Sequence, residues 1–477
     1  MSMEHVPRVM VAGVGSGSGK TTITCGLLAA LKRRDIKAST CKCGPDYIDP
    51  MFHEQIHHFP STNLDLYFVQ NDIIKYLLQR NAKGSAVSVI EGVMGFYDGC
   101  GMTTDAASSY DLARQTQTPV ILILPAKGRA ISVLAELQGF LEFRKDHTIK
   151  GVILNGISPM SGKILKEKIE QEFDVKVYGC VPTLENFQLE SRHLGLVTPY
   201  ELENLEQELD KLGADMEQYL DIDGILTLAH TASDLDSDCP DRIKKIYEKQ
   251  KDAITSIKSA KLRIGVARDL AFCFYYKDNL EFLKEMGCEI VPFSPLQDSE
   301  LPKLLDAVIF GGGYPEIYAR QLSENQSMRE SVYRELSNGL CCMAECGGFM
   351  YLHEQMEDQT KQAYPMVGFI KGKTEKKERL VRFGYAELSA QERNPFLMEE
   401  ERIKAHEFHY WDSDNNGNAW RATKPSGNRS WECMHVTDTM LAGYPHLYFY
   451  SNLQVPIRFL QRCIEQRKER GCSRCLP

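Results

Sequence analysis

The sequence RVMVAGVGSGSGKTTITCGLLAAL, residues 8–31, joins a short apolar run to a glycine- and serine-rich loop and then to a helix-forming run. A strand, a glycine loop with Gly-Lys-Thr and a helix are the context of a phosphate-binding loop. The backbone N–H groups of such a loop, and the N-terminus of its helix, point toward an anion. This stretch therefore predicts an α/β domain that binds a nucleotide.

The loop departs slightly from the strict phosphate-loop spacing. Counting back from Gly19, the usual first glycine position holds Val14, and Gly13 lies one residue farther out. Lys20 is placed to reach the β- and γ-phosphates, and the Thr21 hydroxyl is placed to hold Mg²⁺. A flexible glycine turn is the alternative, which the flanking strand and helix disfavour. The expected binding residues are Gly13, Gly15, Ser16, Gly17, Gly19, Lys20, Thr21 and Thr22.

Apolar runs recur along the first half of the chain, with helical patterns between them. AVSVIEGV (86–93), PVILILPA (119–126) and KGVILNGI (150–157) each have the continuous apolar character of a strand buried on both faces. Alternation of such strands with helices is typical of a parallel sheet wrapped by helices. The same alternation resumes at Lys261, after a helical, polar and then strongly charged stretch.

These patterns predict an α/β protein of two domains, each built on a mostly parallel sheet with helices on both faces. We expect the first domain at residues 1–230 and the second at residues 261–477. Residues 231–260 are interpreted as the link, because they are polar, charged and rich in turn residues. A chain of 477 residues is too long for one hydrophobic core, which favours this division.

Composition and charge restrict the partners and the compartment. The net charge of −9 argues against nucleic acid, because binding to its phosphates needs a basic face. No apolar run approaches the roughly 20 residues of a membrane span, and the first residues lack a signal-peptide pattern. Fifteen cysteines in this setting indicate reduced thiols in a cytoplasmic protein. Cys472 and Cys475 supply only two of the four ligands of a structural zinc, so we expect an exposed tail there.

Acidic residues follow two predicted strands, where a metal at the phosphate loop needs oxygen ligands. Glu91 ends an apolar strand, and a carboxylate at the carboxyl edge of a parallel sheet faces the ligand crevice. Asp98 lies in the loop after it, and Asp46 and Asp49 lie in the loop CKCGPDYIDP. Each aspartate alone is equally well explained as a turn or helix-cap residue. Glu91 is the stronger candidate for a ligand.

A second informative stretch is NGLCCMAECGGFMYL, residues 338–352, which has the form of a strand, a sharp turn and a helix. Small residues on both sides leave room for Cys346 at the turn. The start of a helix lowers the pKa of a cysteine, which favours the nucleophilic thiolate. Cys341 and Cys342 lie within the apolar strand, where thiols behave as small hydrophobic side chains. We therefore expect Cys346 to be a nucleophile.

A cysteine nucleophile needs a base, and the second domain offers several histidines. His353 follows on the helix behind the turn and is expected to point away. The segments AHEFHYW and GYPHLYFYSN contain the stronger contenders, His406, His409 and His446, between which the residue patterns do not decide. The segment IFGGGYPE ends a further strand in a glycine loop, whose N–H groups suit an oxyanion hole.

Motifs in both halves resemble those of one group of two-domain enzymes. The first half resembles the dethiobiotin-synthetase-like P-loop ligases, whose loop also carries one extra residue, and the second half resembles class I glutamine amidotransferase domains. The domain order is similar to that of the cobyrinic acid a,c-diamide synthase family. The segments that carry the resemblance are GSGKTT, KCGPDYIDP, EGVMGFYDG, SRHLGLV, GGGYPE, AECGGFMYL, GYAEL, HEFHY and GYPHLYFYSN.

The resemblance implies that ATP phosphorylates the c and a carboxylates of cobyrinic acid, a corrinoid of cobalamin biosynthesis, and that ammonia from L-glutamine displaces the phosphate. It implies Cys346 as the glutaminase nucleophile and His446 as its base, although this chain has GYPHLYF where the family usually has SYxHLHF. Asn155 is expected at the adenine. The resemblance places the substrates at Asp46, Tyr47, Asp49, Asp98, Gly312 and Gly313, and Mg²⁺ at Thr21, Glu91 and Asp46.

Three alternatives stay open. A sister diamide synthase acting on nickel sirohydrochlorin or hydrogenobyrinic acid would share nearly all of these motifs. A cobyric acid synthase shares the domain pair, but we expect a different segment in place of GPDYIDP. A non-catalytic P-loop switch protein with an inactive amidotransferase domain is disfavoured by the turn around Cys346 and by His446.

Overall fold

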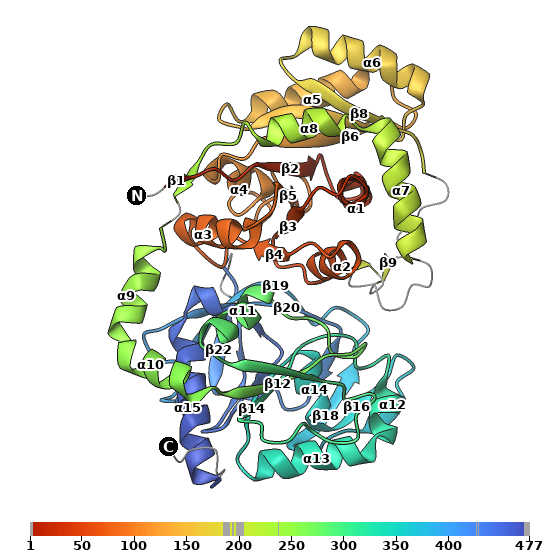
Figure 1. The fold of residues 1–477 in the computed structure, drawn as a ribbon. Helices are drawn as coiled ribbons and strands as arrows, with labels where there is room; N and C mark the ends of the chain where they lie inside the picture. Colours follow the sequence, from red (N-terminus) through yellow and green to blue (C-terminus); the bar gives the residue numbers. More distant parts are fainter. Residues whose placement is uncertain are drawn as a thin grey trace. The chain divides into compact units, whose positions relative to one another are not determined.

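The computed structural model describes residues 3–184, 191–192, 195–196, 205–236, 238–425, 427 and 429–471. The chain divides into two compact units, Met1–Pro240 and Asp241–Pro477 (Figure 1). The predicted tail with Cys472 and Cys475 lies outside the described residues, as do residues 193, 194 and 197 of the segment SRHLGLV.

The first unit is built on one sheet of seven parallel strands. The apolar runs expected as strands lie within it, and β2 is buried along its whole length, as a strand covered on both faces must be. The strands, in spatial order, are β4 (Ser61–Leu64), β3 (Ala38–Cys43), β5 (Val87–Glu91), β2 (Arg8–Gly13), β6 (Val120–Pro125), β7 (Ile149–Asn155) and β8 (Lys176–Val181).

Helices cover this sheet, and the phosphate loop enters the first of them. Val9 and Val11 of β2 share a core with Leu28 of α1 and with Leu212 and Met216 of α7. The helices of the unit are α1 (Lys20–Arg33), α2 (Ile48–Phe52), the π-helix η1 (His53–His57), α3 (Asn71–Ala82), α4 (Ser109–Gln115), α5 (Ser132–Phe143), α6 (Pro159–Glu172), α7 (Leu205–Tyr219) and α8 (Ile222–Ala229). A nucleotide-binding loop is thus anchored between a fully buried strand and a buried helix.

Residues 231–260, interpreted from the sequence as a link, are mostly regular structure. The short strand β11 (Leu235–Asp236) pairs antiparallel with β1 (Met3–Glu4) in the first unit. Helices α9 (Asp241–Lys249) and α10 (Lys251–Ala260) lie in the second unit. The division between the units therefore falls after Pro240, inside the stretch that the sequence marks as a link.

The second unit contains a six-stranded sheet that carries the strand-turn-helix segment. All its strands run parallel except the edge strand β24, which is antiparallel to β25. The spatial order is β13 (Glu289–Phe293), β12 (Arg263–Ala267), β14 (Ala307–Phe310), β15 (Cys341–Glu345), β25 (Met440–Gly443) and β24 (His435–Val436). Its helices include α11 (Lys277–Glu285), α12 (Ala319–Glu324), α13 (Gln326–Ser337), α14 (Gly347–Tyr351) and α15 (Gln454–Glu469).

Two further sheets of the second unit were not expected from the sequence. One is antiparallel, with the order β23 (Ser430–Cys433), β22 (Trp420–Thr423), β19 (Arg382–Ala390), β20 (Ile403–His409) and β26 (His446–Leu447). The other contains β17 (Ala363–Pro365), β16 (His353–Glu357), β18 (Ile370–Lys376) and β21 (Trp411–Ser413). Most of these strands mix polar with apolar residues, so they lack the continuous apolar run by which a buried parallel strand is recognised.

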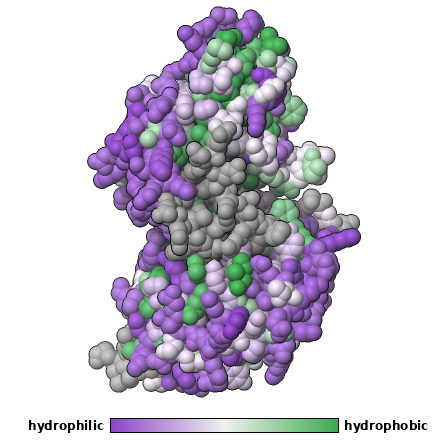
Figure 2. Space-filling view, turned by 90° about the vertical axis from the view of Figure 1, so that its right-hand side faces the viewer, coloured by the Kyte–Doolittle hydropathy of each residue, from purple (hydrophilic) through white to green (hydrophobic). Residues whose placement is uncertain are grey.

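The face of the molecule in Figure 2 is mostly hydrophilic on each unit, with smaller apolar areas between the polar residues. Exposed apolar side chains in the first unit include Met160 and Ile164 of α6. Among the residues that the structure describes, no helix combines the length and the apolar character of a membrane span.

Candidate active sites in the two units

The phosphate loop of the first unit is held in shape by its own hydrogen bonds. The Ser18 hydroxyl donates to the Gly15 carbonyl oxygen at 2.6 Å, and Asn155 Nδ2 donates to the Ser18 carbonyl oxygen at 2.9 Å. Gly19 has a φ of 93°, and a Cβ there would lie 2.3 Å from Asn155 Nδ2, so only glycine fits. Ser16 and Gly17 at the tip of the loop are exposed. Asn155, expected at the adenine, thus braces the loop.

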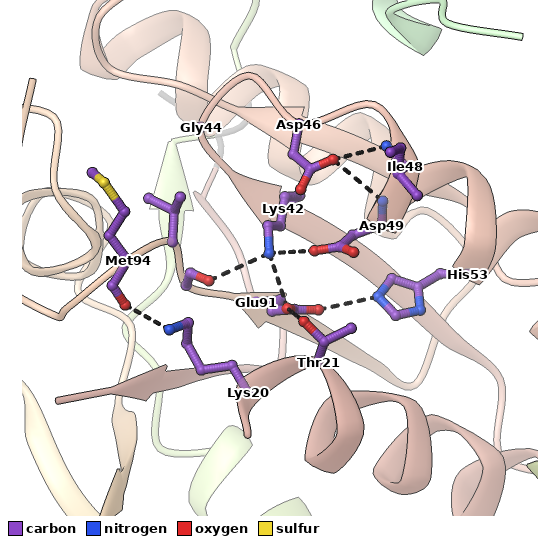
Figure 3. A network of polar contacts seen from close by, with 12 residues as sticks. Lys20, Thr21, Lys42, Gly44, Asp46, Ile48, Asp49, His53, Glu91 and Met94 are labelled. Carbon is purple, nitrogen blue, oxygen red and sulfur yellow. Dashed lines mark hydrogen bonds and ion pairs between the residues drawn. The ribbon is translucent and has the colours of Figure 1, made fainter. Parts of the chain in front are cut away.

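Lys20, the first residue of α1, directs its side chain back over the loop (Figure 3). Its Nζ donates to the Gly15 carbonyl oxygen at 3.0 Å and to the Met94 carbonyl oxygen at 2.6 Å. Burial lowers the pKa of Lys20, and the neighbouring Lys42 ammonium lowers it further. A phosphate oxygen is a stronger partner for an ammonium group than these neutral carbonyls. Lys20 is therefore positioned to contact a nucleotide phosphate at this loop.

Glu91, at the end of β5, is the centre of a buried polar network (Figure 3). Its Oε1 accepts from Thr21 Oγ1 at 2.8 Å and from Lys42 Nζ at 2.9 Å, and its Oε2 lies 3.3 Å from His53 Nε2. Lys42 Nζ also lies 2.5 Å from Asp49 Oδ2. Lys42 and Glu91 are partners in the register of β3 and β5, which places both side chains on one face of the sheet. Thr21 and Glu91, both predicted as Mg²⁺ ligands, are thus in hydrogen-bond contact with each other.

The charges in this network compensate one another. Burial lowers the pKa of Lys42, but the carboxylates of Asp49 and Glu91 outweigh burial and raise it well above its ordinary value. Burial raises the pKa of Glu91, but Lys42 and His53 outweigh burial and hold it well below its ordinary value. Burial, and then the carboxylate of Asp46, raise the pKa of Asp49. Lys42 was not among the predicted site residues, because its partner Glu91 lies 49 residues later in the chain.

The predicted substrate residues of the first unit have local backbone partners as well. Asp46 Oδ1 accepts from the Ile48 backbone N–H at 2.8 Å at the start of α2, where Tyr47 is the N-cap residue. Asp98 Oδ2 accepts from the Gly95 backbone N–H at 2.8 Å. These are the cap and turn contacts that the sequence allowed as alternatives.

Cys346 lies at the sharp turn between β15 and α14 in the second unit. It has a φ of 49° and a ψ of −106°, which a residue with a side chain adopts only under constraint. Its backbone N–H donates to the Gly443 carbonyl oxygen at 2.9 Å. Cys341 and Cys342 are fully buried within β15. The predicted strand, turn and helix around Cys346 are thus present, with the strained backbone of a nucleophile elbow.

Gly312 lies between Cys346 and His446. A Cβ on Gly312 would meet His446 Cε1 at 2.4 Å, His446 Nε2 at 3.0 Å and the Cys346 Cβ at 3.5 Å. The Cε1–Nε2 edge of the His446 imidazole and the Cys346 side chain therefore both approach Gly312. His446 is on β26, which pairs with β20 so that His446 is directly opposite His406.

Glu345, the residue before the predicted nucleophile, lies on the other side of the His446 ring. Its Oε2 is 3.7 Å from His446 Nδ1, and its Oε1 accepts from the Leu447 backbone N–H at 3.0 Å. Burial raises the pKa of Glu345 to about 8. No acid was predicted for this site, and the structure brings Glu345 to His446 from a distant part of the chain.

The thiol and imidazole are both shifted toward their neutral forms. Burial, and then the carboxylate of Glu316, raise the pKa of Cys346, whereas the start of a helix was expected to lower it. The expected lowering fails because α14 is only five residues long and the thiol is fully enclosed. Burial, and then the neighbouring His406 and His409, lower the pKa of His446 to about 3.

The other histidines that competed for the role of base have different surroundings. His409 Nδ1 lies 2.6 Å from the Trp411 carbonyl oxygen, and its Nε2 lies 3.1 Å from Glu407 Oε2. Its ring stacks on Tyr444 with centroids 3.8 Å apart. His353 Nε2 lies 2.7 Å from the Ser413 hydroxyl oxygen. The rings of His409 and His353 are therefore each engaged by other polar groups.

Two family models match the chain. Residues 9–197 match the CobQ/CobB/MinD/ParA nucleotide binding domain, and residues 263–453 match the CobB/CobQ-like glutamine amidotransferase domain. The cobyrinate a,c-diamide synthase of Caldanaerobacter subterraneus subsp. tengcongensis is 38% identical over 457 residues, which cover 95% of this chain and 98% of the relative. The chain belongs to the cobyrinate a,c-diamide synthase family.

Other relatives with the same name show a similar match. That of Clostridium acetobutylicum is 38% identical over 93% of this chain and 98% of its own length. That of Thermoplasma volcanium is 36% identical over 98% of this chain and 100% of its own length. The family expected from motifs such as GPDYIDP and EGVMG is confirmed, as is the α/β fold with a nucleotide-binding half and a glutamine amidotransferase half.

Proposed function

We propose that this chain is a ligase that amidates the a and c carboxylates of cobyrinic acid in cobalamin biosynthesis, with ATP as the activating nucleotide and L-glutamine as the nitrogen source. Membership in the cobyrinate a,c-diamide synthase family supports this function. The observation that carries it is the presence on one chain of a phosphate loop ending in Lys20 and a cysteine elbow facing His446. The first activates a carboxylate, and the second releases ammonia.

Activation takes place at the phosphate loop. Lys20 exchanges its two carbonyl partners for phosphate oxygens, and the loop N–H groups orient the γ-phosphoryl group toward a corrinoid carboxylate. The carboxylate oxygen attacks the γ-phosphorus, ADP leaves, and an acyl phosphate forms. Transferring a phosphoryl group demands charge stabilisation above all, which a buried ammonium supplies.

Mg²⁺ fits the donor set beside this loop. The Thr21 hydroxyl and the Glu91 carboxylate are oxygen ligands 2.8 Å apart, and Asp49 and Asp46 lie in the same cluster. When bound, the ion neutralises charge on the phosphates. Lys42 offsets the negative charge of Glu91, which lowers the repulsion that an incoming corrinoid carboxylate meets.

Glutamine is hydrolysed at Cys346. The thiol proton passes to His446 Nε2, the sulfur attacks the side-chain amide carbon, and ammonia leaves with that proton. Water then cleaves the thioester and releases glutamate. The backbone N–H groups of Gly313 and Gly347, which lie close together beside Cys346, are the donors that we assign to the oxyanion. The ammonia displaces phosphate from the acyl phosphate to give the amide.

Glu345 acts in this scheme as a positioning residue. Its carboxyl group holds the Nδ1 side of His446 and stabilises the imidazolium that forms when Nε2 takes the thiol proton. We expect Glu345→Gln to lower glutamine-dependent turnover roughly tenfold. The wild-type pH profile rises as Glu345 loses its proton near pH 8, and the variant lacks that component.

A control separates this role from a structural one. Glu354→Gln changes an exposed carboxylate of the same unit and leaves both the rate and the pH profile unchanged. A Glu345→Gln enzyme whose pH profile matches the wild type would show that Glu345 only packs.

We also propose that the enzyme is cytoplasmic, acts on small molecules and has no nucleic-acid or membrane partner. The net charge and the thiol content of the sequence favour this.

The test of the substrate is a panel of tetrapyrroles, each assayed with ATP, Mg²⁺ and glutamine. Two amidations lower the mass of cobyrinic acid by about one unit each, whereas nickel sirohydrochlorin and hydrogenobyrinic acid stay unchanged. Turnover of either of these and not of cobyrinic acid would reassign the substrate. Glutamine-stimulated ADP release without any tetrapyrrole would support a switch protein.

A further inference from the structure

Three buried side chains behind the phosphate loop converge on one point. Cys25 is on α1, one helical turn beyond Thr21, and His53 and His57 are at the two ends of η1. The Cys25 Sγ and one ring nitrogen of each histidine all lie within 4.8 Å of one another. The three residues are 0%, 1% and 2% exposed, respectively.

Two ring nitrogens in this cluster have no hydrogen-bond partner. Among the described residues, the structure gives no donor or acceptor to His53 Nδ1 or to His57 Nε2, and both atoms are buried. Phe52 and Phe59 pack against the two rings, so the surroundings on those sides are apolar. Buried polar atoms in native proteins nearly always have a partner. Each of the two rings that approach the Cys25 thiol therefore has a buried nitrogen without a partner, which points to a ligand that the three residues share.

Glu91 fixes which nitrogen of His53 is available. An ionised carboxylate only accepts hydrogen bonds, so the 3.3 Å contact between Glu91 Oε2 and His53 Nε2 requires the proton on Nε2 (Figure 3). The lone pair of Nδ1 is then free on the opposite edge of the ring. A carboxylate that orients a histidine in this way is the usual second-shell arrangement of a metal-binding imidazole.

We propose that Cys25, His53 and His57 bind one zinc ion. A thiolate and two imidazoles are ligands that zinc prefers, and they do not suit Mg²⁺. Zinc bonds of roughly 2.0–2.3 Å place tetrahedral ligand atoms roughly 3.3–3.8 Å apart. Side-chain shifts of about 1 Å close the site from the 4.8 Å limit. A water molecule supplies the fourth ligand.

The charge states agree with a site that releases a proton when it fills. Burial, and then the neighbouring His53, lower the pKa of His57 well below its ordinary value, so its imidazole is neutral. Burial, and then the Glu91 carboxylate, raise the pKa of Cys25 well above its ordinary value, so its thiol keeps its proton. Zinc replaces that proton, and one proton per ion is released to solvent.

The ion has a structural consequence for the neighbouring site. It ties α1 to η1. Helix α1 follows the phosphate loop, and η1 continues directly from α2, the helix that contains Asp49. The ion also holds His53 in the tautomer that donates to Glu91, the predicted Mg²⁺ ligand. This inference does not rest on the proposed amidation, because its test uses the metal alone.

The experiment uses the full chain with Cys472→Ser and Cys475→Ser, so that the terminal pair offers no thiolate. The protein is stripped with chelator and titrated with Co²⁺ and then Zn²⁺ in excess Mg²⁺, without ATP. We expect one equivalent to bind, a thiolate-to-cobalt absorption band that Zn²⁺ removes, one proton released, and a higher midpoint of thermal unfolding.

Two variants and a matched control locate the site. Cys25→Ser loses the thiolate band and His57→Gln weakens binding at least tenfold, whereas Cys41→Ser, at another buried cysteine on β3, binds as the parent does. If Cys25→Ser fails to fold, His57→Gln still tests the site, because it keeps a polar side chain and does not touch Glu91. Substoichiometric binding to the parent, or an unchanged cobalt spectrum in either variant, would overturn the proposal.

Discussion

The site of the first unit and the site of the second unit hold their titratable groups in opposite ways. Around the phosphate loop, Lys42 is charged and paired with Glu91 and Asp49 within 2.9 Å, although all three are buried. At the elbow, Cys346 and His446 are shifted by burial toward the thiol and the neutral imidazole. The first site is organised as charges before any ligand arrives. At the second site, burial favours the neutral forms of the thiol and the imidazole.

This difference suits the two reactions. Phosphoryl transfer brings several negative charges, which a preformed ammonium group stabilises without reorganisation. A permanent thiolate, by contrast, is open to oxidation and alkylation. The nitrogen source separates the two sites experimentally, because only the glutamine reaction needs the second unit, whereas both reactions need the first.

The largest effect is expected at the base. His446→Ala removes the only proposed acceptor of the thiol proton, so glutamine-dependent amidation falls by roughly 10²–10⁴. Amidation with ammonium salts stays within about twofold, because its residues lie in the first unit. The assay is product formation with each nitrogen source. His409→Ala is the matched control and keeps glutamine-dependent amidation. If His409→Ala lost this activity and His446→Ala kept it, the role of base would belong to His409.

Lys20→Ala should affect both reactions alike. The variant lacks the charge that stabilises the transferring phosphoryl group, so amidation falls by roughly 10²–10³ with glutamine and with ammonium. Lys83→Ala, at an exposed lysine of the same unit, changes neither rate. Near-normal amidation by Lys20→Ala with either nitrogen source would remove the phosphate loop from the mechanism.

The raised pKa of Cys346 predicts a distinctive pH dependence of its reactivity. Below a raised pKa, the thiolate fraction grows about tenfold for each pH unit. Alkylation of Cys346 by iodoacetamide, followed by peptide mass spectrometry without glutamine, therefore rises steadily from about pH 6 to about pH 9. A plateau reached below pH 7 would mean a lowered pKa and a preformed thiolate, which would erase the contrast between the two sites.

The smallest effect is expected at Asn155. Asn155→Ala loses one hydrogen bond to the Ser18 carbonyl oxygen, which is worth about 1 kcal/mol. KM for ATP therefore rises about fivefold, with kcat for amidation nearly unchanged. An isothermal titration with ATP gives the binding component separately. A change of more than about a hundredfold would indicate a direct contact with the nucleotide, as the sequence first suggested.

The parts of the fold that follow from local physics were predictable from the sequence. Continuous apolar runs gave the central strands β5, β6 and β7, and the glycine loop located the nucleotide end of the first sheet. The antiparallel sheets were not predicted, because strands such as β19 alternate irregularly between polar and apolar residues. Their pairing depends on contacts between distant segments, which a periodicity does not record.

The site residues also differ in whether a local sequence pattern or a distant partner defines them. Thr21, Glu91 and Cys346 could be singled out because each belongs to a recognisable local pattern at the carboxyl end of a strand. Lys42 and Glu345 could not, because their roles arise from partners 49 and 101 residues away in the chain, Glu91 and His446. The pKa of Cys346 was predicted in the wrong direction because burial is a property of the whole unit.

The most direct test of two separate sites is Cys346→Ser assayed with glutamine and with ammonium, side by side. Cys342→Ser serves as the control, since it makes the same substitution at a buried cysteine within β15. Serine lacks an accessible thiolate at neutral pH, so the account predicts no glutamine-dependent amidation by Cys346→Ser. It also predicts undiminished amidation with ammonium, which increases with pH as more NH₃ is available. Glutamine-dependent product from Cys346→Ser, or an ammonium reaction lost together with it, would contradict the account.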